Sequence, residues 1–429
     1  MIAMALLLLV MMFTSAQAAI VSNVEPRRDN RTGDIIELGD GSLAKFGDRF
    51  YLYGVRYPCV PSPHTPLFYL CPQKDRRIWG NMSFGVASSP DLVHWTVESY
   101  NILPEMHDPA TRWPVAQYAW FMPTIVHNPA TGRYALWYYI DAYARGVAVS
   151  TSPTGPFTIV HDCVPNLQLG SSFFFWTAST GDIYMKHNGG CGGTAPVVKP
   201  GGACPVHKAG RGPGICIAKL APNLTDIVES SPALDLPGEG GGIFERGGRW
   251  YVMQGSGCCF CWAGDGARVF ESDSGPYGPY TAVNNGNNNL INCSHANHRG
   301  YPGQGVTSNL TCGGPGPGSY CPPAMQRPPS MQCAPDAPRR GPGAQQFGVF
   351  PVPLAGNGTA YLYVGIRFGS APDGTKCREF QYWDALQFDD EGHVLPMTFQ
   401  ENVHLPGASF NTGVVVVTGG GSDPIDDDN

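Results

Sequence analysis

The sequence predicts an all-β protein, a five-bladed β-propeller with Gly-, Pro- and Cys-rich loop insertions. Two observations predict it. The chain has 429 residues, enough for a core distributed over repeated sheets. A pattern of a short strand, a Gly-containing turn, an aromatic-rich strand and a more polar hairpin recurs five times. Such a hairpin cannot bury its apolar face alone, whereas four-stranded blades stacked around an axis bury each face against the next.

The five copies start near residues 40, 120, 170, 239 and 345. The first copy reads DGSLAKFGDRFYLYG, with a turn at Gly47-Asp48, and the second repeats its Ser-Pro turn. A two-sheet sandwich is the alternative that strand spacing leaves open. The repeated order of inner and outer strand pairs favours the propeller. With their outer hairpins the copies cover residues 40–98, 120–160, 171–228, 239–281 and 345–397.

The two ends of the chain differ from the propeller, which we place at residues 19–410. Residues 1–18 are predicted to be a signal peptide, because an apolar run over residues 5–13 precedes Ala16-Gln17-Ala18. An uncleaved anchor is the alternative, but the run is shorter than the ~20 residues that span a bilayer. We therefore expect a secreted, extracellular protein with no membrane association after cleavage. Residues 418–429 are predicted to form an acidic, disordered tail.

Cysteines and glycosylation motifs agree with export. The fourteen cysteines are an even number, which favours disulfides whose pairing the sequence leaves open. A zinc site is the alternative, but no CxxC pair stands beside a second pair. The segment 284–342 is predicted to be a disulfide-tied loop insertion. Six Asn-x-Ser/Thr motifs predict a glycoprotein; they begin at Asn30, Asn81, Asn223, Asn292, Asn309 and Asn357.

Composition excludes some partners. Charged residues make up 14% of the chain, and 27 basic against 34 acidic residues give a net charge of −7. We therefore expect no nucleic-acid partner. We also expect no cofactor and no metal ligands, and nothing in the sequence indicates a structural cation at the centre.

Candidate catalytic residues lie where the first strand of each copy begins. In a propeller these strands converge on a central channel, so their first side chains face one another. Asp40 opens the first copy and Glu239 the fourth. Glycoside hydrolysis needs a carboxylic acid for the leaving oxygen and a second group that activates water. Carboxylates delivered from different blades would stand roughly 6.5–9.5 Å apart, which predicts inversion of the anomeric centre.

Plainer interpretations stand beside these. Asp40 precedes Gly41 and Ser42 and is equally a turn cap, and Glu239 in PGEGGG is equally an exposed loop charge. Gln345 and Gln346, at the start of the fifth copy, are ordinary polar loop residues on base rates, and Asp141 a strand-end cap. Trp120 and Phe121, like Trp137, Tyr138 and Tyr139, are more typical of blade core than of a sugar platform.

These residues resemble glycoside hydrolase family 43, five-bladed propeller enzymes that act on arabinan, xylan and galactan. The resemblance covers residues 40–397 and begins with DGSLAKFGDRFYLYG and ASSPDLVHW. Four further segments, TGRYALWYYID, VAVSTSPTGPF, EGGGIF and WDALQFDDEG, are similar to the exo-β-1,3-galactanase branch. The resemblance implies Glu239 as general acid, Asp40 as general base, and Gln345, with Gln346 as the fallback, as an unusual base. For substrate binding we name Trp120, Phe121, Asp141, Gln346 and Arg367.

The chain departs from that branch at three places. Phe121 stands where the branch has a blade-two Glu, and Gly170, Ser171 and Ser172 stand where the family has a blade-three Asp. The motif GDRW becomes GIRF, which keeps Arg367. We predict a secreted hydrolase that inverts O-glycosidic bonds of a cell-wall or extracellular polysaccharide, with exo-β-1,3-galactan as the candidate. A catalytically inactive glycan-binding propeller is the alternative, and a structural or protein-interaction propeller ranks last.

Overall fold

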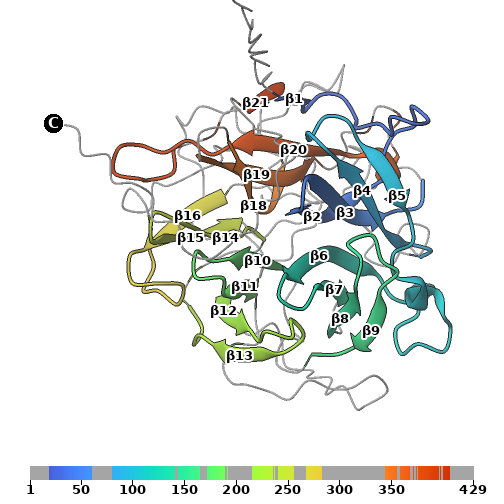
Figure 1. The fold of residues 1–429 in the computed structure, drawn as a ribbon, viewed down its shortest axis with the longest axis horizontal. Helices are drawn as coiled ribbons and strands as arrows, with labels where there is room; N and C mark the ends of the chain where they lie inside the picture. The colour runs from blue at the N-terminus through green and yellow to red at the C-terminus, as the bar shows by residue number, and fades with distance from the viewer. Residues whose placement is uncertain are drawn as a thin grey trace, which may run out of the picture.

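The fold is that of a five-bladed β-propeller (Figure 1), seen here in a computed structural model. Five antiparallel sheets surround a common centre, and the first strand of each lies innermost. This confirms the predicted fold class and excludes the sandwich. The structure describes residues 19–59, 80–140, 144–164, 172–188, 191, 215–234, 236, 240–255, 267–282, 344–354, 358–367, 371, 373, 375–395, 397 and 400–405. The predicted signal peptide, loop insertion 284–342 and tail 418–429 lie outside the described residues.

The strands follow the five sequence copies. Blade one contains β2 (Gly39–Phe46), β3 (Arg49–Arg56), β4 (Ser83–Ser89) and β5 (Thr96–Ser99). Blade two contains β6 (Trp120–Asn128), β7 (Arg133–Ile140), β8 (Ala144–Ser150) and β9 (Thr158–His161). Blade three contains β10 (Phe173–Thr177), β11 (Ile183–Asn188), β12 (Ile215–Leu220) and β13 (Ile227–Ser230). Blade four contains β14 (Ile243–Arg246), β15 (Arg249–Gly255), β16 (Ala267–Ser272) and β17 (Thr281–Ala282). Blade five contains β18 (Gln345–Pro353), β19 (Thr359–Arg367) and β20 (Phe380–Ala385). The described residues also include the 3-10 turns η1 (Pro104–His107) and η6 (Lys376–Arg378), which lie between strands.

Aromatic residues fill the space between blades. Trp95 of blade one meets Trp383 of blade five with ring centroids 5.9 Å apart, and Phe244 meets Tyr361 at 5.6 Å. Buried aromatic pairs of this geometry contribute about 0.5–1.5 kcal/mol each beyond the area they bury. The alternating aromatic residues of the sequence copies therefore supply the side chains that pack one blade against the next.

A bulge at the start of the innermost strands turns residues toward the axis. The pairing register shifts between Gly39 and Ser42 in β2, and between Phe121 and Thr124 in β6. Each bulge holds a non-glycine residue at positive φ, Asp40 at 45° and Met122 at 56°. Because a bulge re-aims side chains at one end of a strand, these starts are where a site is expected.

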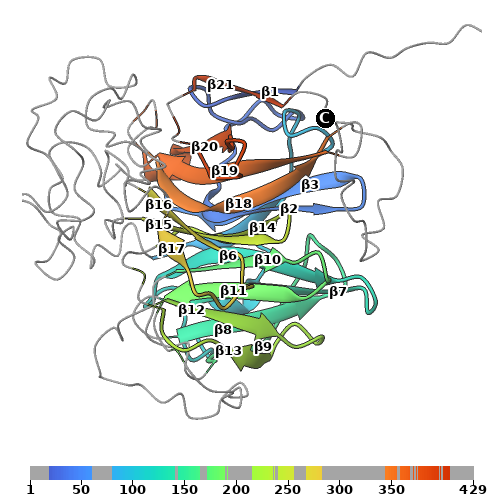
Figure 2. The ribbon, with the colours of Figure 1, turned by 90° about the vertical axis from the view of Figure 1, so that its left-hand side faces the viewer.

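The two ends of the described chain close the ring. β1 (Ala19–Ser22) pairs antiparallel with β21 (Asn402–Leu405), and this ribbon lies beside β20 (Figure 2). Asn23, fully buried after β1, donates its amide to the Trp383 carbonyl at 2.7 Å and accepts from the Trp383 N–H at 2.9 Å. The N-terminal segment is thus fastened to the last blade.

Two disulfides join described residues, in agreement with the predicted disulfide framework. Cys59, which follows β3 of blade one, is bonded to Cys377 in η6, 318 residues away. Cys191 is bonded to Cys216 of β12. The first bond ties blade one to blade five across the closure of the ring.

Among the described residues, no helix is both long and apolar enough to cross a membrane.

Candidate functional site

The starts of the inner strands contact one another around the axis. The Ser42 hydroxyl donates to the Pro123 carbonyl at 3.0 Å, which joins blade one to blade two. The Gly240 N–H donates to the Ser172 hydroxyl at 2.9 Å, which joins blade four to blade three. The sequence prediction that these positions converge is therefore supported by contacts between neighbouring blades.

Asp40 is an isolated buried acid at this convergence. Asp40 is only 4% exposed, and neither oxygen of its carboxylate has a hydrogen-bond partner in the part of the chain that the structure describes. Burial raises the pKa of the Asp40 carboxyl to about 6, while the positive charge of Lys376 opposes this rise and the negative charge of Glu379 adds to it. A carboxylate that lacks partners and titrates near neutrality is suited to accepting a proton from a bound molecule.

Glu239, the predicted acid, lies outside the described residues, but its neighbour Gly240 is held firmly. The Gly240 carbonyl accepts a hydrogen bond from the ammonium of Lys186, which also donates to Asn188 Oδ1 at 2.9 Å. A Cβ built on Gly240 would lie 3.2 Å from Nε2 of Gln346. The chain next to Glu239 is therefore fixed between blades three and five.

Blades one and four start in the same way. A Cβ on Gly41 would lie 1.8 Å from the Tyr53 carbonyl oxygen, and a Cβ on Gly241 would lie 1.9 Å from that of Met253. Both glycines are therefore required by the close approach of the second strand. Gly41 and Gly241 therefore occupy equivalent positions in their blades. By this alignment, Gly240 in blade four takes the place of Asp40 in blade one, and Glu239 is one residue earlier in the sequence.

The predicted substrate-binding residues occupy different environments. Trp120 is fully buried, donates its indole N–H to the Trp113 carbonyl at 2.8 Å and stacks on Tyr138, so it packs as blade core. Phe121 is 9% exposed and stacks on Tyr139. Both placements match the plainer interpretation of these aromatics.

Two of the polar candidates of blade five, Gln346 and Arg367, are buried. Gln346 is 1% exposed, and its carbonyl accepts from the Gly241 N–H at 3.4 Å. The backbone of Gln345 pairs with Ile366, and the structure does not describe its side chain. Arg367 is buried and donates to the Asn23 carbonyl at 2.8 Å. Asp141, like Glu239, lies outside the described residues.

Sequence reasoning missed four buried charged residues near these strand starts. Lys186 and Arg145 are fully buried on blades three and two, and Arg145 donates to the Asn188 carbonyl at 3.0 Å. Lys376 and Glu379 form an ion pair of 2.5 Å before β20. A lysine or arginine inside an otherwise apolar strand, as in IYMKHN and ARGVAVS, was the available signal for the first two.

One group of described side chains has the spacing of metal ligands, namely Glu37, Cys59 and Cys377. The two sulfur atoms of this group are joined in a disulfide. They are not thiolates, so the group has no soft ligands to offer a cation.

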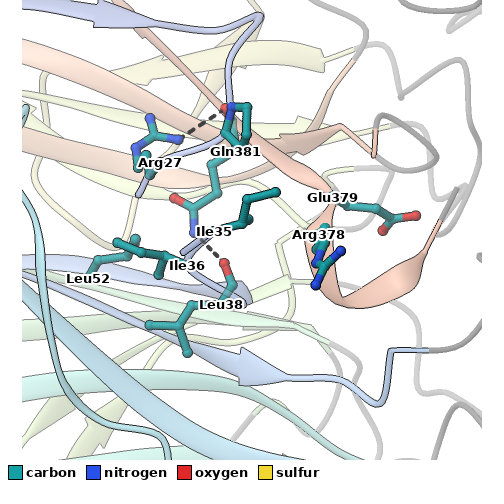
Figure 3. A pocket seen from close by; sticks show the side chains of 9 residues that line it. Arg27, Ile35, Ile36, Leu38, Leu52, Arg378, Glu379 and Gln381 are labelled. Atoms are coloured by element: carbon teal, nitrogen blue, oxygen red, sulfur yellow. Dashed lines mark hydrogen bonds between the residues drawn. The ribbon is translucent and has the colours of Figure 1, made fainter. Parts of the chain in front are cut away.

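A small pocket lies beside the residues that precede β2 (Figure 3). Apolar residues such as Ile36 and Leu38 line it together with Arg27, Glu379 and Gln381. The Gln381 amide donates to the Leu38 carbonyl at 3.2 Å, and Arg27 donates to the Gln381 carbonyl at 3.4 Å. These bonds fix the strand that carries Asp40 against blade five.

The chain was compared with protein families, curated proteins and solved structures, and the last of these identify its fold. No family model matches the chain, and no curated protein matches it either. Solved structures do match. An exo-β-1,3-galactanase from Clostridium thermocellum is similar with a TM-score of 0.57 and 15% identity, over 91% of this chain and 68% of that one. The chain has the fold of the family 43 galactanases.

Two further structures are similar to the same extent. A GH43 β-1,3-galactosidase gives a TM-score of 0.55 at 14% identity, over 89% of this chain and 99% of that one. An exo-β-1,3-galactanase from Phanerochaete chrysosporium, bound to galactose, gives 0.56 at 14% identity, over 92% and 70%. This chain spans about two thirds of the length of the Clostridium and Phanerochaete proteins. The fold component of the sequence resemblance is therefore confirmed.

Proposed function

We propose that this protein is a secreted glycoside hydrolase that inverts the O-glycosidic bonds of a β-1,3-linked galactan, acting from the chain end. The observation that carries the proposal is Asp40, a buried carboxylate with no partner among the described residues, set where the innermost strands converge. Support also comes from the fold, because the similar solved structures include exo-β-1,3-galactanases. The predicted polysaccharide partner agrees with the galactose and β-1,3-galactotriose bound in the Phanerochaete structures.

The mechanism assigns one role to each carboxyl group. Asp40 accepts a proton from water as the water oxygen attacks the anomeric carbon. Glu239 gives its proton to the glycosidic oxygen as the bond to that oxygen breaks, so the leaving sugar departs as a neutral alcohol. Water arrives on the face opposite the leaving group, so a β-linked substrate yields an α-configured product. Gln345 is the alternative residue for orienting the water.

The charges near the two carboxyl groups fit these roles. Asp40 must be ionised to accept a proton, and Lys376 favours its ionised form. The backbone next to Glu239 is held by the buried Lys186. A fixed backbone matters because an acid misplaced by about 1 Å can cost on the order of 100-fold in rate.

The proposal is tested by incubating the purified protein with a panel of polysaccharides and following monosaccharide release and the first anomer by proton NMR. We expect galactose from β-1,3-galactan, first as the α-anomer. Glu239→Gln and Asp40→Asn should each lower kcat by about 10²–10⁴-fold while galactan binding is retained. Undiminished turnover in Glu239→Gln would remove that residue from the mechanism, and a β-anomer formed first would exclude inversion.

Secretion is part of the proposal. Three glycosylation motifs fall on described residues, and Asn30, Asn81 and Asn223 are all exposed. The Cys59–Cys377 and Cys191–Cys216 disulfides suit an oxidising compartment. Expression of the full chain in a eukaryotic host should deliver it to the medium, with a mass that falls on removal of N-linked glycans. Retention of the whole pool inside the cell would contradict this.

A second candidate function is glycan binding without hydrolysis. It is favoured by blade two, where Phe121 and Met122 occupy the bulge, and by blade three, where the Ser172 hydroxyl is engaged by Gly240. Neither blade adds an acid at these positions. Calorimetric binding of galacto-oligosaccharide with no released sugar would select this candidate.

A further inference from the structure

The turn before β20 holds a pair of opposite charges removed from water. Lys376 Nζ lies 2.5 Å from Glu379 Oε2, and the two side chains are 0% and 1% exposed. Burying two charges costs several kcal/mol per ion before their attraction is counted, so a pair of hydrophobic residues is often equally stable here. Stability alone does not explain why the chain places an ion pair at this point.

Three contacts bring this pair to the strand of Asp40. The Lys376 ammonium lies 4.2 Å from the centre of the Tyr57 ring, and that ring lies 3.6 Å from a Cβ built on Gly39. The Gln381 amide donates to the Leu38 carbonyl at 3.2 Å (Figure 3). The Cys59–Cys377 disulfide links the turn to the segment that follows β3. The residues before Asp40 and the charged turn therefore form one packed unit.

We propose that Lys376 and Glu379 are positioning residues for Asp40, with Lys376 supplying the positive charge that keeps this isolated carboxylate ionised and Glu379 holding Lys376 in place. This inference rests on the proposed hydrolase function. It explains why the buried ion pair is present, which packing stability alone does not.

Within the part of the chain that the structure describes, Lys376 and Glu379 are the charged groups that act on the Asp40 carboxyl. Tyr57, just after β3, contacts the Lys376 ammonium, and Arg56 at the end of β3 pairs with Glu37 at 3.2 Å. The bulge of β6 presents Phe121 and Met122, which do not titrate. On β19, Arg367 donates to the Asn23 carbonyl. Lys376 opposes the rise in the Asp40 pKa more strongly than Glu379 adds to it.

Two variants should move the titration of Asp40 in opposite directions. Lys376→Met/Glu379→Leu removes both charges together, so no buried charge is left unpaired. The acid limb of kcat/KM on β-1,3-galactan should then move up by about one pH unit, which is about a tenfold loss of activity below the midpoint. Glu379→Gln keeps an oxygen that can accept from Lys376 but removes the negative charge, so it should move the limb down. Arg378→Gln, which removes a partly exposed charge from the same turn, is the matched control and should leave the limb in place.

A second measurement does not depend on hydrolysis. For each variant, the free energy of unfolding in urea is compared between pH 4 and pH 8 with that of the same protein carrying Asp40→Asn, which isolates the titration of Asp40. We expect the same opposite shifts. If the chain does not hydrolyse galactan, this measurement still decides the inference. If it hydrolyses galactan and neither limb nor titration moves, the positioning role is overturned and the hydrolase proposal stands.

Discussion

At the scale of single residues, Asp40 is the position on which the proposed function depends most. The sequence marks it as an acid before a Gly-Ser turn at the start of a repeat, which suffices to nominate it and leaves a turn cap as the alternative. The carboxylate caps nothing among the described residues, because neither oxygen has a partner there. A capping aspartate elsewhere in blade one behaves differently, since Asp91 Oδ1 accepts from the backbone N–H of Val93 and His94.

Asp40 should weaken the fold as pH rises. Its pKa is raised to about 6 in the folded protein from an ordinary 3.8, so the folded state binds more protons between these values and stability falls as pH rises through that window. The loss at pH 7 is about 3 kcal/mol. Asp40→Asn removes this loss, so urea unfolding should show the variant gaining on the wild type by a similar amount between pH 4 and pH 7.

The control for that measurement is Asp91→Asn. Burial raises the pKa of Asp91, but hydrogen bonds from His94 and Val93 outweigh it and lower the pKa, so its contribution has the opposite sign and is lost as pH falls. A pH-independent difference between Asp40→Asn and the wild type would show that Asp40 has an ordinary pKa, and with it the argument for a poised base would fail.

At the scale of elements, the start of each inner strand is decided by backbone geometry. Gly41 and Gly241 sit under the carbonyl of the neighbouring strand, and no side chain larger than hydrogen fits there. The three glycines of EGGGIF indicate an unusual backbone conformation, but the sequence does not show which glycine the close approach of the next strand requires. The structure singles out Gly241, through its contact with Met253.

Gly241→Ala should therefore be severe. Its φ of +70° disfavours a side chain, and the added Cβ would lie 1.9 Å from the Met253 carbonyl oxygen. We expect a loss of about 3 kcal/mol or more in the free energy of unfolding, because the backbone must shift. Gly247→Ala is the matched control, with φ of +56° and nothing within 4 Å of the new Cβ, and should cost about 1 kcal/mol. Equal losses in the two variants would contradict the close approach.

At the scale of the whole molecule, the ring is closed by contacts between distant segments. Asn23 bonds to Trp383 through both atoms of its amide and to the Gln400 carbonyl at 3.0 Å. The Cys59–Cys377 disulfide adds a covalent tie between blade one and blade five. A propeller with unfastened ends can open between its first and last blades, so these contacts bear on the stability of every blade.

Asn23→Ala should lower the free energy of unfolding by about 3 kcal/mol. It removes three side-chain hydrogen bonds and leaves the buried Trp383 N–H and carbonyl without that partner. The matched control is Asn128→Ala, whose exposed amide donates to the Pro222 carbonyl between blades two and three. It should cost about 1 kcal/mol or less, and differential scanning calorimetry compares the two. A small loss at Asn23 would show that the closure does not depend on it.

The sequence by itself determined the five repeats, because the alternation of aromatic and small residues is local and each copy states it again. It also determined which residues open the first, fourth and fifth blades, and so nominated Asp40, Glu239 and Gln345. What only the tertiary structure decided is the surroundings of Asp40. The charges of Lys376 and Glu379 act on it from blade five, and Lys186 reaches Gly240 across a blade boundary. Charges act through distance in space, and the distance between residues of different blades is set by how the blades pack, which no local pattern encodes.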